Sequence, residues 1–332
     1  MAVMFVLSSA LLASFAAAGP SFSIADLGHA DFTAASINNR GQILGQVGAN
    51  AIVLSGRGSV EIDGLPGFAM TLANGVNDAG LVVGTSSTPG YQFNGRAFLW
   101  QKGASVALDG DDATETSEAN AINAAGQIVG ARGGIAAMWD HGEVRSLGVL
   151  PNGYASSAVA INRYGQIAGV SIRGSSSAFF YDRGSLQQAG DLDGYGVAAA
   201  HALNDAGEVV GTAFDSELTP SAWRAYVWRN GVTTDLGVLQ KDATWNVANA
   251  INSAGTIVGT AMFIDGATSS HAFIYDSGAL RDLNTLIPPH TGWVLTGATS
   301  INDAGRIVGS GVVNGETHAF VLTPIAAVSR HR

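Results

Sequence analysis

A few histidine and carboxylate side chains are the groups in this chain that could transfer protons. His201 lies among alanines and amides, while Asp111, Glu115 and Asp242 lie in other segments. Together they could supply the general acid and base of a hydrolase or lyase acting on a polysaccharide. That chemistry needs two carboxylates at a defined separation, which this spacing does not establish. The chain also has no cysteine, no HExxH zinc motif and no GxSxG elbow. We therefore expect a protein without catalytic residues and keep the enzyme as the alternative.

One acidic segment could instead bind a cation. Asp109, Asp111 and Asp112 stand close together, with Glu115 and Glu118 nearby, and could offer hard oxygen ligands to Ca²⁺. The segment lacks the spacing and the closing Glu of an EF-hand loop. We prefer a solvated acidic loop, keep Ca²⁺ as the alternative, and expect no other cofactor or metal.

A further set of residues suits recognition, because it holds a constant place in the sequence while changing in identity. Seven asparagines recur at Asn38, Asn77, Asn123, Asn162, Asn204, Asn252 and Asn302. Variable polar residues on a rigid frame can read a ligand, although the same side chains could simply satisfy nearby backbone groups. The residues three places before each of these asparagines are Ala35, Asn74, Asn120, Val159, His201, Asn249 and Thr299.

Aromatic residues accompany six of the seven positions. Each lies at most nine residues before the recurring Asn, where a ring could stack on a sugar or a peptide, or pack inside the fold. These six are Phe32, Phe68, Tyr154, Tyr195, Trp245 and Trp293. The candidate ligand-binding residues are accordingly Asn74, Asn120, His201, Asn249, Thr299, Tyr154, Tyr195, Trp245 and Trp293.

The elements that must position these residues are copies of one repeat. Around each recurring Asn the sequence reads Ala-x-Ala-Ile-Asn-x-x-Gly-x-Ile-Val-Gly with small variations, and the copies lie 39 to 50 residues apart. That period is typical of propeller blades. Asn and Gly predict a tight turn between two strands, so we expect the seven asparagines to be structural. Small residues before the Asn favour the crowded innermost strand of a blade.

Two more strands complete each repeat. A third strand of the RAFLW or HAFIY type follows, and a fourth ends near a Leu-Gly corner. The last repeat stops after its third strand, but residues 22–28, FSIADLG, match the missing fourth one. The sequence therefore predicts an all-β fold, a seven-bladed β-propeller of four-stranded blades in which the N-terminal strand completes the last blade.

The repeat resembles the bacterial extracellular HAF repeat proteins. The Asn-x-x-Gly repeat and the literal His-Ala-Phe triplets at His271–Phe273 and His318–Phe320 carry this resemblance, which extends over nearly everything after residue 21. Membership implies secretion and a repeated β-architecture, and it brings no reaction, substrate or catalytic residue. Many relatives end in a Pro-Glu-Pro sorting segment, which these residues do not contain.

Composition and charge narrow the choice of partners. The net charge of −10 repels phosphate backbones and anionic lipid, so neither nucleic acid nor a membrane is an expected partner. The uncharged apolar run at residues 1–18 predicts a signal peptide, although it lacks a basic start.

The sequence thus predicts a signal peptide at 1–18, a propeller at 19–324 and a C-terminal tail at 325–332. We expect a monomeric protein, secreted or periplasmic, that acts as a binding or interaction scaffold for an extracellular glycan or protein at the axial face.

Overall fold

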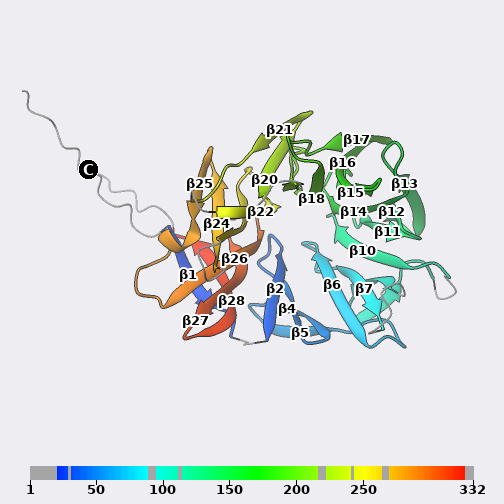
Figure 1. Cartoon of the computed structure of the whole chain (residues 1–332). Coiled ribbons are helices and arrows are strands. Elements are labelled where there is room, and N and C mark those ends of the chain that lie inside the picture. The colour runs from blue at the N-terminus through cyan, green and yellow to red at the C-terminus, as the bar shows by residue number, and fades with distance from the viewer. Residues whose placement is uncertain are drawn as a thin grey trace, which may run out of the picture.

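The computed structural model describes residues 21–28, 31–88, 95–110, 114–215, 222–240, 243–263 and 269–325. The predicted signal peptide and nearly all of the predicted tail lie outside these ranges. The described strands form seven four-stranded antiparallel blades that follow one another around a ring (Figure 1). A single parallel bridge, between Trp223 and Trp245, joins the fifth and sixth blades. The predicted seven-bladed propeller is confirmed. None of the helices described is long and apolar enough to cross a membrane.

Small residues place the first strand of each repeat innermost. The Ala four places before each recurring Asn is buried in all seven blades, from Ala34 at 7% exposed to Ala298 at 0%. Only a methyl group fits where neighbouring blades converge. The innermost strands are β2 (Phe32–Ile37), β6 (Met70–Val76), β10 (Ser117–Ile122), β14 (Ala155–Ile161), β18 (Val197–Leu203), β22 (Ala243–Ile251) and β26 (Trp293–Ile301).

The second strand of each blade starts after the Asn-Gly turn, and in five of the seven blades its glycine pairs with an aromatic residue of the third strand. Gly259 pairs with Phe273, and a Cβ added at Gly259 would lie 2.6 Å from the Phe273 ring. Glycine is therefore required beneath the HAF phenylalanine. The second strands are β3 (Ile43–Val47), β7 (Val82–Ser87), β11 (Ile128–Arg132), β15 (Ile167–Ile172), β19 (Val209–Asp215), β23 (Ile257–Phe263) and β27 (Ile307–Val313).

In the sixth and seventh blades the third strand carries the buried Ala and Phe of the HAF triplet, and the His of the triplet reaches an Asp of the outer strand; Arg224 does the same in the fifth blade. His271 Nδ1 lies 2.7 Å from Asp282 Oδ2, and Arg224 Nε lies 3.8 Å from Asp235 Oδ2. The third strands are β4 (Asn50–Ser55), β8 (Arg96–Gln101), β12 (Ile135–Asp140), β16 (Ser176–Asp182), β20 (Ala222–Arg229), β24 (Ser269–Asp276) and β28 (Glu316–Pro324). The outer strands are β5 (Gly58–Ile62), β9 (Ala104–Ala107), β13 (Glu143–Gly148), β17 (Ser185–Ala189), β21 (Val232–Asp235), β25 (Ala279–Asp282) and β1 (Phe22–Asp26).

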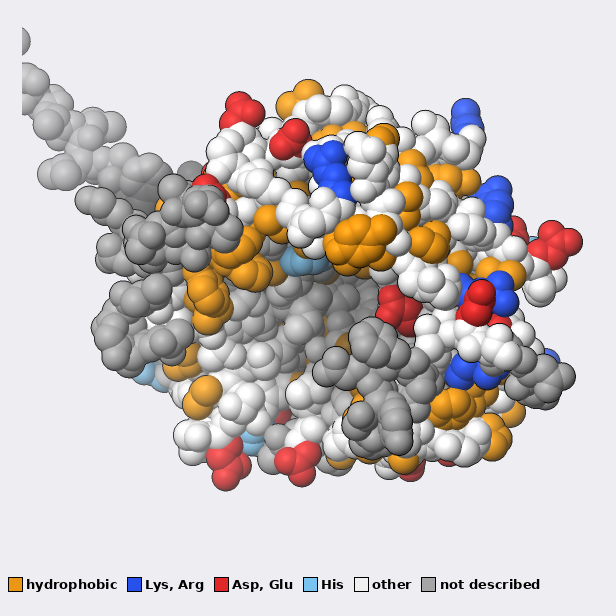
Figure 2. Space-filling model, turned by 45° about the vertical axis from the view of Figure 1, so that its right-hand side comes forward, with side chains coloured by type: hydrophobic (Ala, Val, Ile, Leu, Met, Phe, Trp, Pro, Cys, Tyr) orange, Lys and Arg blue, Asp and Glu red, His pale blue; other side chains and the backbone are white. Residues whose placement is uncertain are grey.

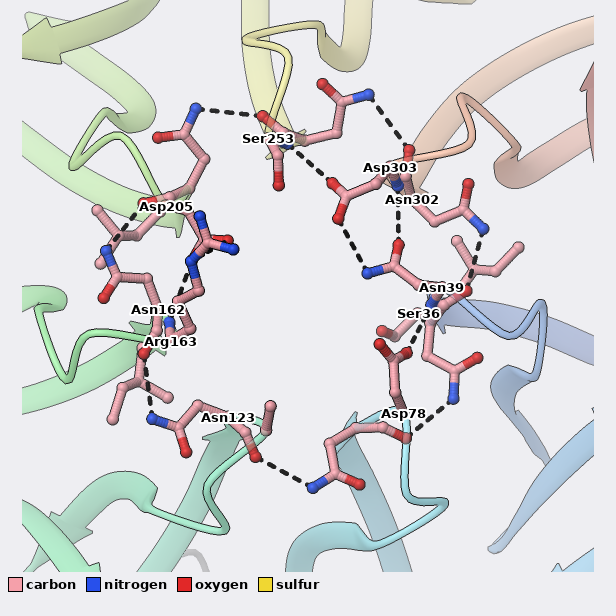
Figure 3. Close-up of a pocket in the computed structure, with 18 of the residues that line it drawn as sticks. Ser36, Asn39, Asp78, Asn123, Asn162, Arg163, Asp205, Ser253, Asn302 and Asp303 are labelled. Carbon is pink, nitrogen blue, oxygen red and sulfur yellow. Dashed lines mark hydrogen bonds and ion pairs between the residues drawn. The ribbon is translucent and has the colours of Figure 1, made fainter.

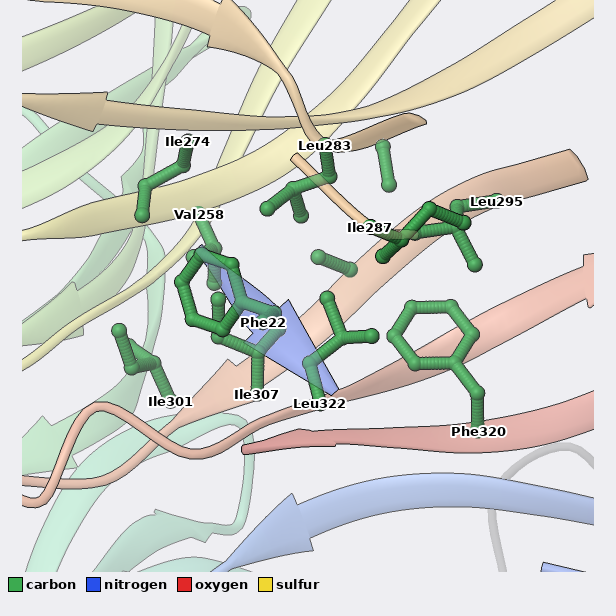
Figure 4. Close-up of a cluster of buried hydrophobic side chains, with 12 residues drawn as sticks. Phe22, Val258, Ile274, Leu283, Ile287, Leu295, Ile301, Ile307, Phe320 and Leu322 are labelled. Atoms are coloured by element: carbon green, nitrogen blue, oxygen red, sulfur yellow. The ribbon is translucent and has the colours of Figure 1, made fainter. Parts of the chain in front are cut away.

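The ring closes through β1, which lies beside β28 although the two strands are the first and last of the chain (Figure 1). They pair antiparallel from Phe22 opposite Pro324 to Asp26 opposite Phe320. Phe22 enters the apolar cluster shared by the sixth and seventh blades, near Val258 and Leu322 (Figure 4). A short 3-10 helix, η1 (Leu283–Thr285), leads from β25 toward β26. The predicted completion of the last blade by the N-terminal strand is confirmed.

Candidate ligand-binding site

The seven recurring asparagines form a closed ring at one end of the propeller, here called the turn face (Figure 3). Each is at most 6% exposed, so its amide must find partners inside the protein. In every blade the Asn Oδ1 accepts a hydrogen bond from the backbone N–H four residues later, which closes its own turn. Each Nδ2 donates to the backbone carbonyl of the next blade's Asn at 2.9–3.2 Å: Asn38 to Asn77, Asn77 to Asn123, Asn123 to Asn162, Asn162 to Asn204, Asn204 to Asn252, Asn252 to Asn302, and Asn302 to Asn38.

The predicted turn role of these asparagines is therefore confirmed, but the bonds between blades were not predicted. A turn alone needs only an acceptor, which Asp would also provide. The signal in the sequence is that Asn, the side chain with both an acceptor and a donor, occurs at all seven positions.

The residues that follow the asparagines form the rim of a cavity of about 330 Å³ on the turn face. Asp78 Oδ1 accepts from the backbone N–H of Asn39 at 2.8 Å, and Asp303 Oδ2 accepts from Asn39 Nδ2 at 2.9 Å. Asp303 Oδ1 also accepts from the backbone N–H of Ser253 at 2.9 Å. These polar groups are bonded to one another across blades, as Figure 3 shows.

Asp303 is held in its charged form by this network. Burial by itself raises the pKa of Asp303, but the hydrogen bonds from Ser253 and Asn39 and the positive charge of Arg163 outweigh it and leave the pKa below its usual value. Arg163 itself pairs with Asp205, with Nε 3.4 Å from Oδ2. The polar groups at the rim of the turn face are thus bonded to one another. Few of them are left to bind a ligand, apart from charged groups that are in contact with solvent.

The variable residues three places before each Asn occupy a β-bulge in every blade. The register between the first and second strands shifts at this point in all seven repeats. A bulge re-aims the side chain of the extra residue. Five of these side chains bond at 2.8–2.9 Å to the carbonyl of the innermost Ala of the next blade: Asn74 to Ala119, Asn120 to Ala158, His201 to Ala248, Asn249 to Ala298 and Thr299 to Ala34.

These five residues thus have a structural role, the alternative that the sequence left open. Ala35 and Val159 occupy the other two positions and have no side-chain donor. For Asn74, Asn120, His201, Asn249 and Thr299 a role in ligand binding stays a prediction.

His201 is neutral at physiological pH. Burial lowers its pKa, and the hydrogen bond to the Ala248 carbonyl opposes this shift only in part. Because a carbonyl only accepts, Nδ1 carries the proton. His201 is thereby a bridge between the fifth and sixth blades, and the alternative enzyme would have to use its Nε2.

The predicted aromatic residues divide into packed and exposed rings. Trp245 stacks on Trp223 with ring centroids 5.4 Å apart, and Trp293 meets His318 and Phe320 edge-on. Tyr195 packs against the apolar core shared by the fourth and fifth blades. Tyr154 is different, since it is 69% exposed. Of the four predicted rings, Tyr154 has the freest surface for stacking.

Two of the predicted carboxylates, Asp109 and Glu115, lie within the described residues, and both pair with Arg132. Asp109, with its side chain 1% exposed, accepts from Trp139 Nε1 at 2.9 Å and lies 3.3 Å from Arg132 Nε. Glu115 pairs with the same Arg132 at 3.4 Å. The other predicted members, Asp111, Asp112 and Asp242, lie outside the described residues. The residues that the structure describes contain no group of three acidic or histidine side chains able to hold a metal ion, and the Ca²⁺ site stays a prediction.

The opposite end of the ring, where the innermost strands begin, is here called the loop face. There a hollow of about 500 Å³ opens between the second, third and fourth blades. The space-filling view shows a face of the molecule that is hollowed at the centre of the ring and rimmed in part by hydrophobic side chains (Figure 2). The hollow is lined by Leu72, Thr85, Ser87, Gly95, Thr116, Ser117, Glu118, Ala131, Gly134, Ala155, Ser156, Ser157, Val170 and Ile172.

The lining combines apolar side chains with hydroxyl groups. Thr85 Oγ1 is buried and has no hydrogen-bond partner among the described residues. Tyr154 stands beside the hollow, since its backbone N–H bonds to the carbonyl of Ile172, a lining residue. The sequence did not predict this hollow, because its walls come from three blades. The residues that line it also differ in type from the residues at the equivalent positions of other repeats.

Comparison with known proteins supports the fold and no narrower identity. No family model matches the chain, and no curated protein matches it. Among solved structures, a puromycin-hydrolyzing peptidase from Mycobacterium tuberculosis is 13% identical with a TM-score of 0.55, covering 94% of this chain and 55% of that one. A chain of a mitotic checkpoint complex is also 13% identical, with a TM-score of 0.53 and coverage of 98% and 99%. At such identities the likeness concerns the fold alone.

Proposed function

We propose that this protein is a secreted or periplasmic, non-catalytic binding scaffold that takes a glycan in the hollow of the loop face. The observation that carries the proposal is the composition of that hollow. Hydroxyl groups and apolar side chains line about 500 Å³ of space, and the exposed residue Tyr154 directly precedes the lining residue Ala155. Sugars present both hydroxyls and apolar C–H faces, so such a surface complements them.

The rest of the molecule supports a scaffold better than a catalyst. The recurring Asn ring and the bulged residues use their polar atoms to join one blade to the next. The rim of the turn face is likewise paired within itself. Export agrees with the apolar run at residues 1–18 and with the resemblance to extracellular HAF repeat proteins.

The test is a glycan array followed by calorimetry on a variant that fills the hollow. Leu72 is 41% exposed and lines the hollow, so Leu72→Trp adds bulk there without entering a core. We expect Leu72→Trp to weaken glycan binding about tenfold or more, a loss typical of a blocked pocket. Val232→Trp is the matched control, because Val232 is 65% exposed on the outer strand β21.

Two results would contradict the proposal. One is an array on which the wild-type protein binds no glycan. The other is a bound glycan whose affinity is the same for Leu72→Trp and Val232→Trp. Cleavage products in the same incubations would instead favour the alternative, a polysaccharide hydrolase or lyase.

A further inference from the structure

We propose that the glycan carries a free ammonium group and that Glu118 receives it, so that the ligand is an oligosaccharide of amino sugars. This inference rests on the proposed function, because it concerns the same hollow. It assigns a role to Glu118, a residue that the sequence placed only near the acidic loop of residues 109–112.

Glu118 is the one carboxylate among the innermost strands. The seven strands β2, β6, β10, β14, β18, β22 and β26 contain no other Asp, Glu, Lys or Arg. The positions equivalent to Glu118 in the other blades are Thr33, Leu72, Ser157, Ala199, Val247 and Gly297. The repeat frame therefore requires no carboxylate here.

The carboxylate is held in place from one side. Glu118 Oε1 accepts from Ser157 Oγ at 2.6 Å and from Asn120 Nδ2 at 3.4 Å. Asn120 is itself fixed by its bond to the Ala158 carbonyl at 2.9 Å. A hydroxyl donor at 2.6 Å is in the range of charge-assisted hydrogen bonds. Glu118 is thus oriented before any ligand arrives, which reduces the entropic cost of binding.

The other carboxylate oxygen has no partner among the described residues. Oε2 makes no hydrogen bond or ion pair there, and the described lining of the hollow includes no Lys, Arg or His. Arg132, which follows the lining residue Ala131, is paired with Asp109 and Glu115. Oε2 is thus available to accept a charge-assisted hydrogen bond from a cationic group of a ligand, and no basic side chain of the described lining would repel that group.

The surroundings favour a sugar as the carrier of that cation. The same hollow is lined by Thr85, whose hydroxyl has no hydrogen-bond partner among the described residues, and by the apolar side chains of Leu72 and Val170. A sugar ring with hydroxyls on its edges and an ammonium on one carbon complements all three kinds of group. A neutral N-acetyl group at the same carbon would leave Glu118 Oε2 without a cation.

The experiment compares two tetramers of the same length by calorimetry at pH 6, where a sugar amine carries its proton. One is a glucosamine tetramer and the other is the N-acetylglucosamine tetramer. We expect wild-type protein to bind the charged tetramer about tenfold or more tightly, as for a charged hydrogen bond. The preference should shrink as salt is added, because part of it is electrostatic.

Glu118→Gln should remove the preference, and Glu143→Gln should keep it. Glu143 is the matched control, since it lies exposed on the outer strand β13 of the same blade. The inference is overturned if wild-type protein binds both tetramers equally, or if Glu118→Gln keeps the preference. The wild-type comparison decides the matter even if Glu118→Gln does not fold.

Failure of this inference can be told from failure of the proposed function. Suppose that the protein binds a neutral glycan, that Leu72→Trp weakens this binding, and that the charged tetramer is not preferred. This result overturns the role of Glu118 and leaves the proposed function standing. An array without any bound glycan overturns both. A lysine tripeptide is the third probe. If the protein binds this tripeptide, loses that binding in Glu118→Gln, and binds neither tetramer, the ligand is a cationic peptide and the assignment to a sugar is overturned.

Discussion

At the scale of single residues, the recurring Asn does two tasks that neither Asp nor Ser can combine. Its Oδ1 accepts the turn amides and its Nδ2 donates to the next blade, and both groups are buried. Asp keeps the acceptors and loses the donor, whereas Ser is too short to span the turn. The turn role could be predicted from Asn and Gly, but the bond to the next blade depends on the ring geometry, which one repeat does not specify.

Replacing one of these asparagines should destabilise the protein. Asn162→Ala removes a donor to Asn204 and leaves the backbone N–H groups of Tyr164 and Gln166 without their acceptor. We expect a loss of about 2–4 kcal/mol in the free energy of unfolding, since buried polar groups are left unpaired. Urea denaturation measures it.

Asn162→Asp separates the two tasks, because it keeps the turn acceptors and faces a carboxylate toward the Asn204 carbonyl. Asn162→Asp should lower the free energy of unfolding as much as Asn162→Ala does. Asn50→Ala is the control, since Asn50 is exposed at the start of β4, and it should change the free energy by less than about 0.5 kcal/mol. If Asn162→Ala lowered the free energy of unfolding no more than Asn50→Ala, the ring of asparagines would be dispensable for stability.

At the scale of strands, the HAF triplet joins the third strand to its neighbours on both sides. Its Phe covers the glycine of the second strand, and its first residue pairs with an Asp on the outer strand. In the seventh blade that pair is His318 on β28 and Asp26 on β1, with Nδ1 and Oδ2 2.8 Å apart. The HAF resemblance identified the triplet, but the acidic partner of each histidine became apparent only from the pairing of the strands.

The His318–Asp26 pair makes the attachment of β1 depend on pH. The hydrogen bond to Asp26 raises the pKa of His318, burial opposes this, and the negative charges of Asp26 and Glu316 add to it. Because the folded pKa lies above the unfolded value near 6.5, the stabilisation is fully present below about pH 6.5 and is lost as the pH rises through the folded pKa. Asp26→Asn should therefore lower the Tm more at pH 5.5 than at pH 9.

Asp235→Asn is the matched control for this prediction. Asp235 holds the same place in the repeat and accepts from Gly237, as Asp26 accepts from Gly28. Its partner is Arg224, which stays charged at both pH values. The decrease in Tm caused by Asp235→Asn should be alike at the two pH values. Equal decreases for Asp26→Asn at pH 5.5 and pH 9 would show that His318 does not titrate as described.

At the scale of the whole molecule, repetition explains what the sequence could and could not predict. The blade number and the closure by residues 22–28 follow from counting repeats, because each blade must have four strands. The bulge at Asn74 and its equivalents left no such signal, since it adds one residue to every copy alike. The hollow beside Glu118 depends on differences between three blades, so periodicity could not reveal it.

Closure of the ring should depend on Phe22 more than on any exposed residue of β1. Phe22 is 7% exposed and packs with Val258, Ile307 and Leu322, so Phe22→Ala opens a cavity in the core shared by two blades. We expect Phe22→Ala to lower the free energy of unfolding by about 3–5 kcal/mol, measured by thermal and urea unfolding. Deleting residues 21–28 should lower the Tm further, because it also leaves β28 as an unpaired edge.

Ser23→Ala is the control on the same strand, since Ser23 is exposed and its hydroxyl bonds only to the Thr323 carbonyl, at 3.3 Å. Ser23→Ala should lower the free energy of unfolding by less than about 0.5 kcal/mol. Two-state unfolding in every variant would mean that the blades depend on one another around the ring, as closure implies. If deletion of residues 21–28 left the melting curve unchanged, the pairing of β1 with β28 would contribute nothing to stability, and the ring would hold by contacts between blades alone.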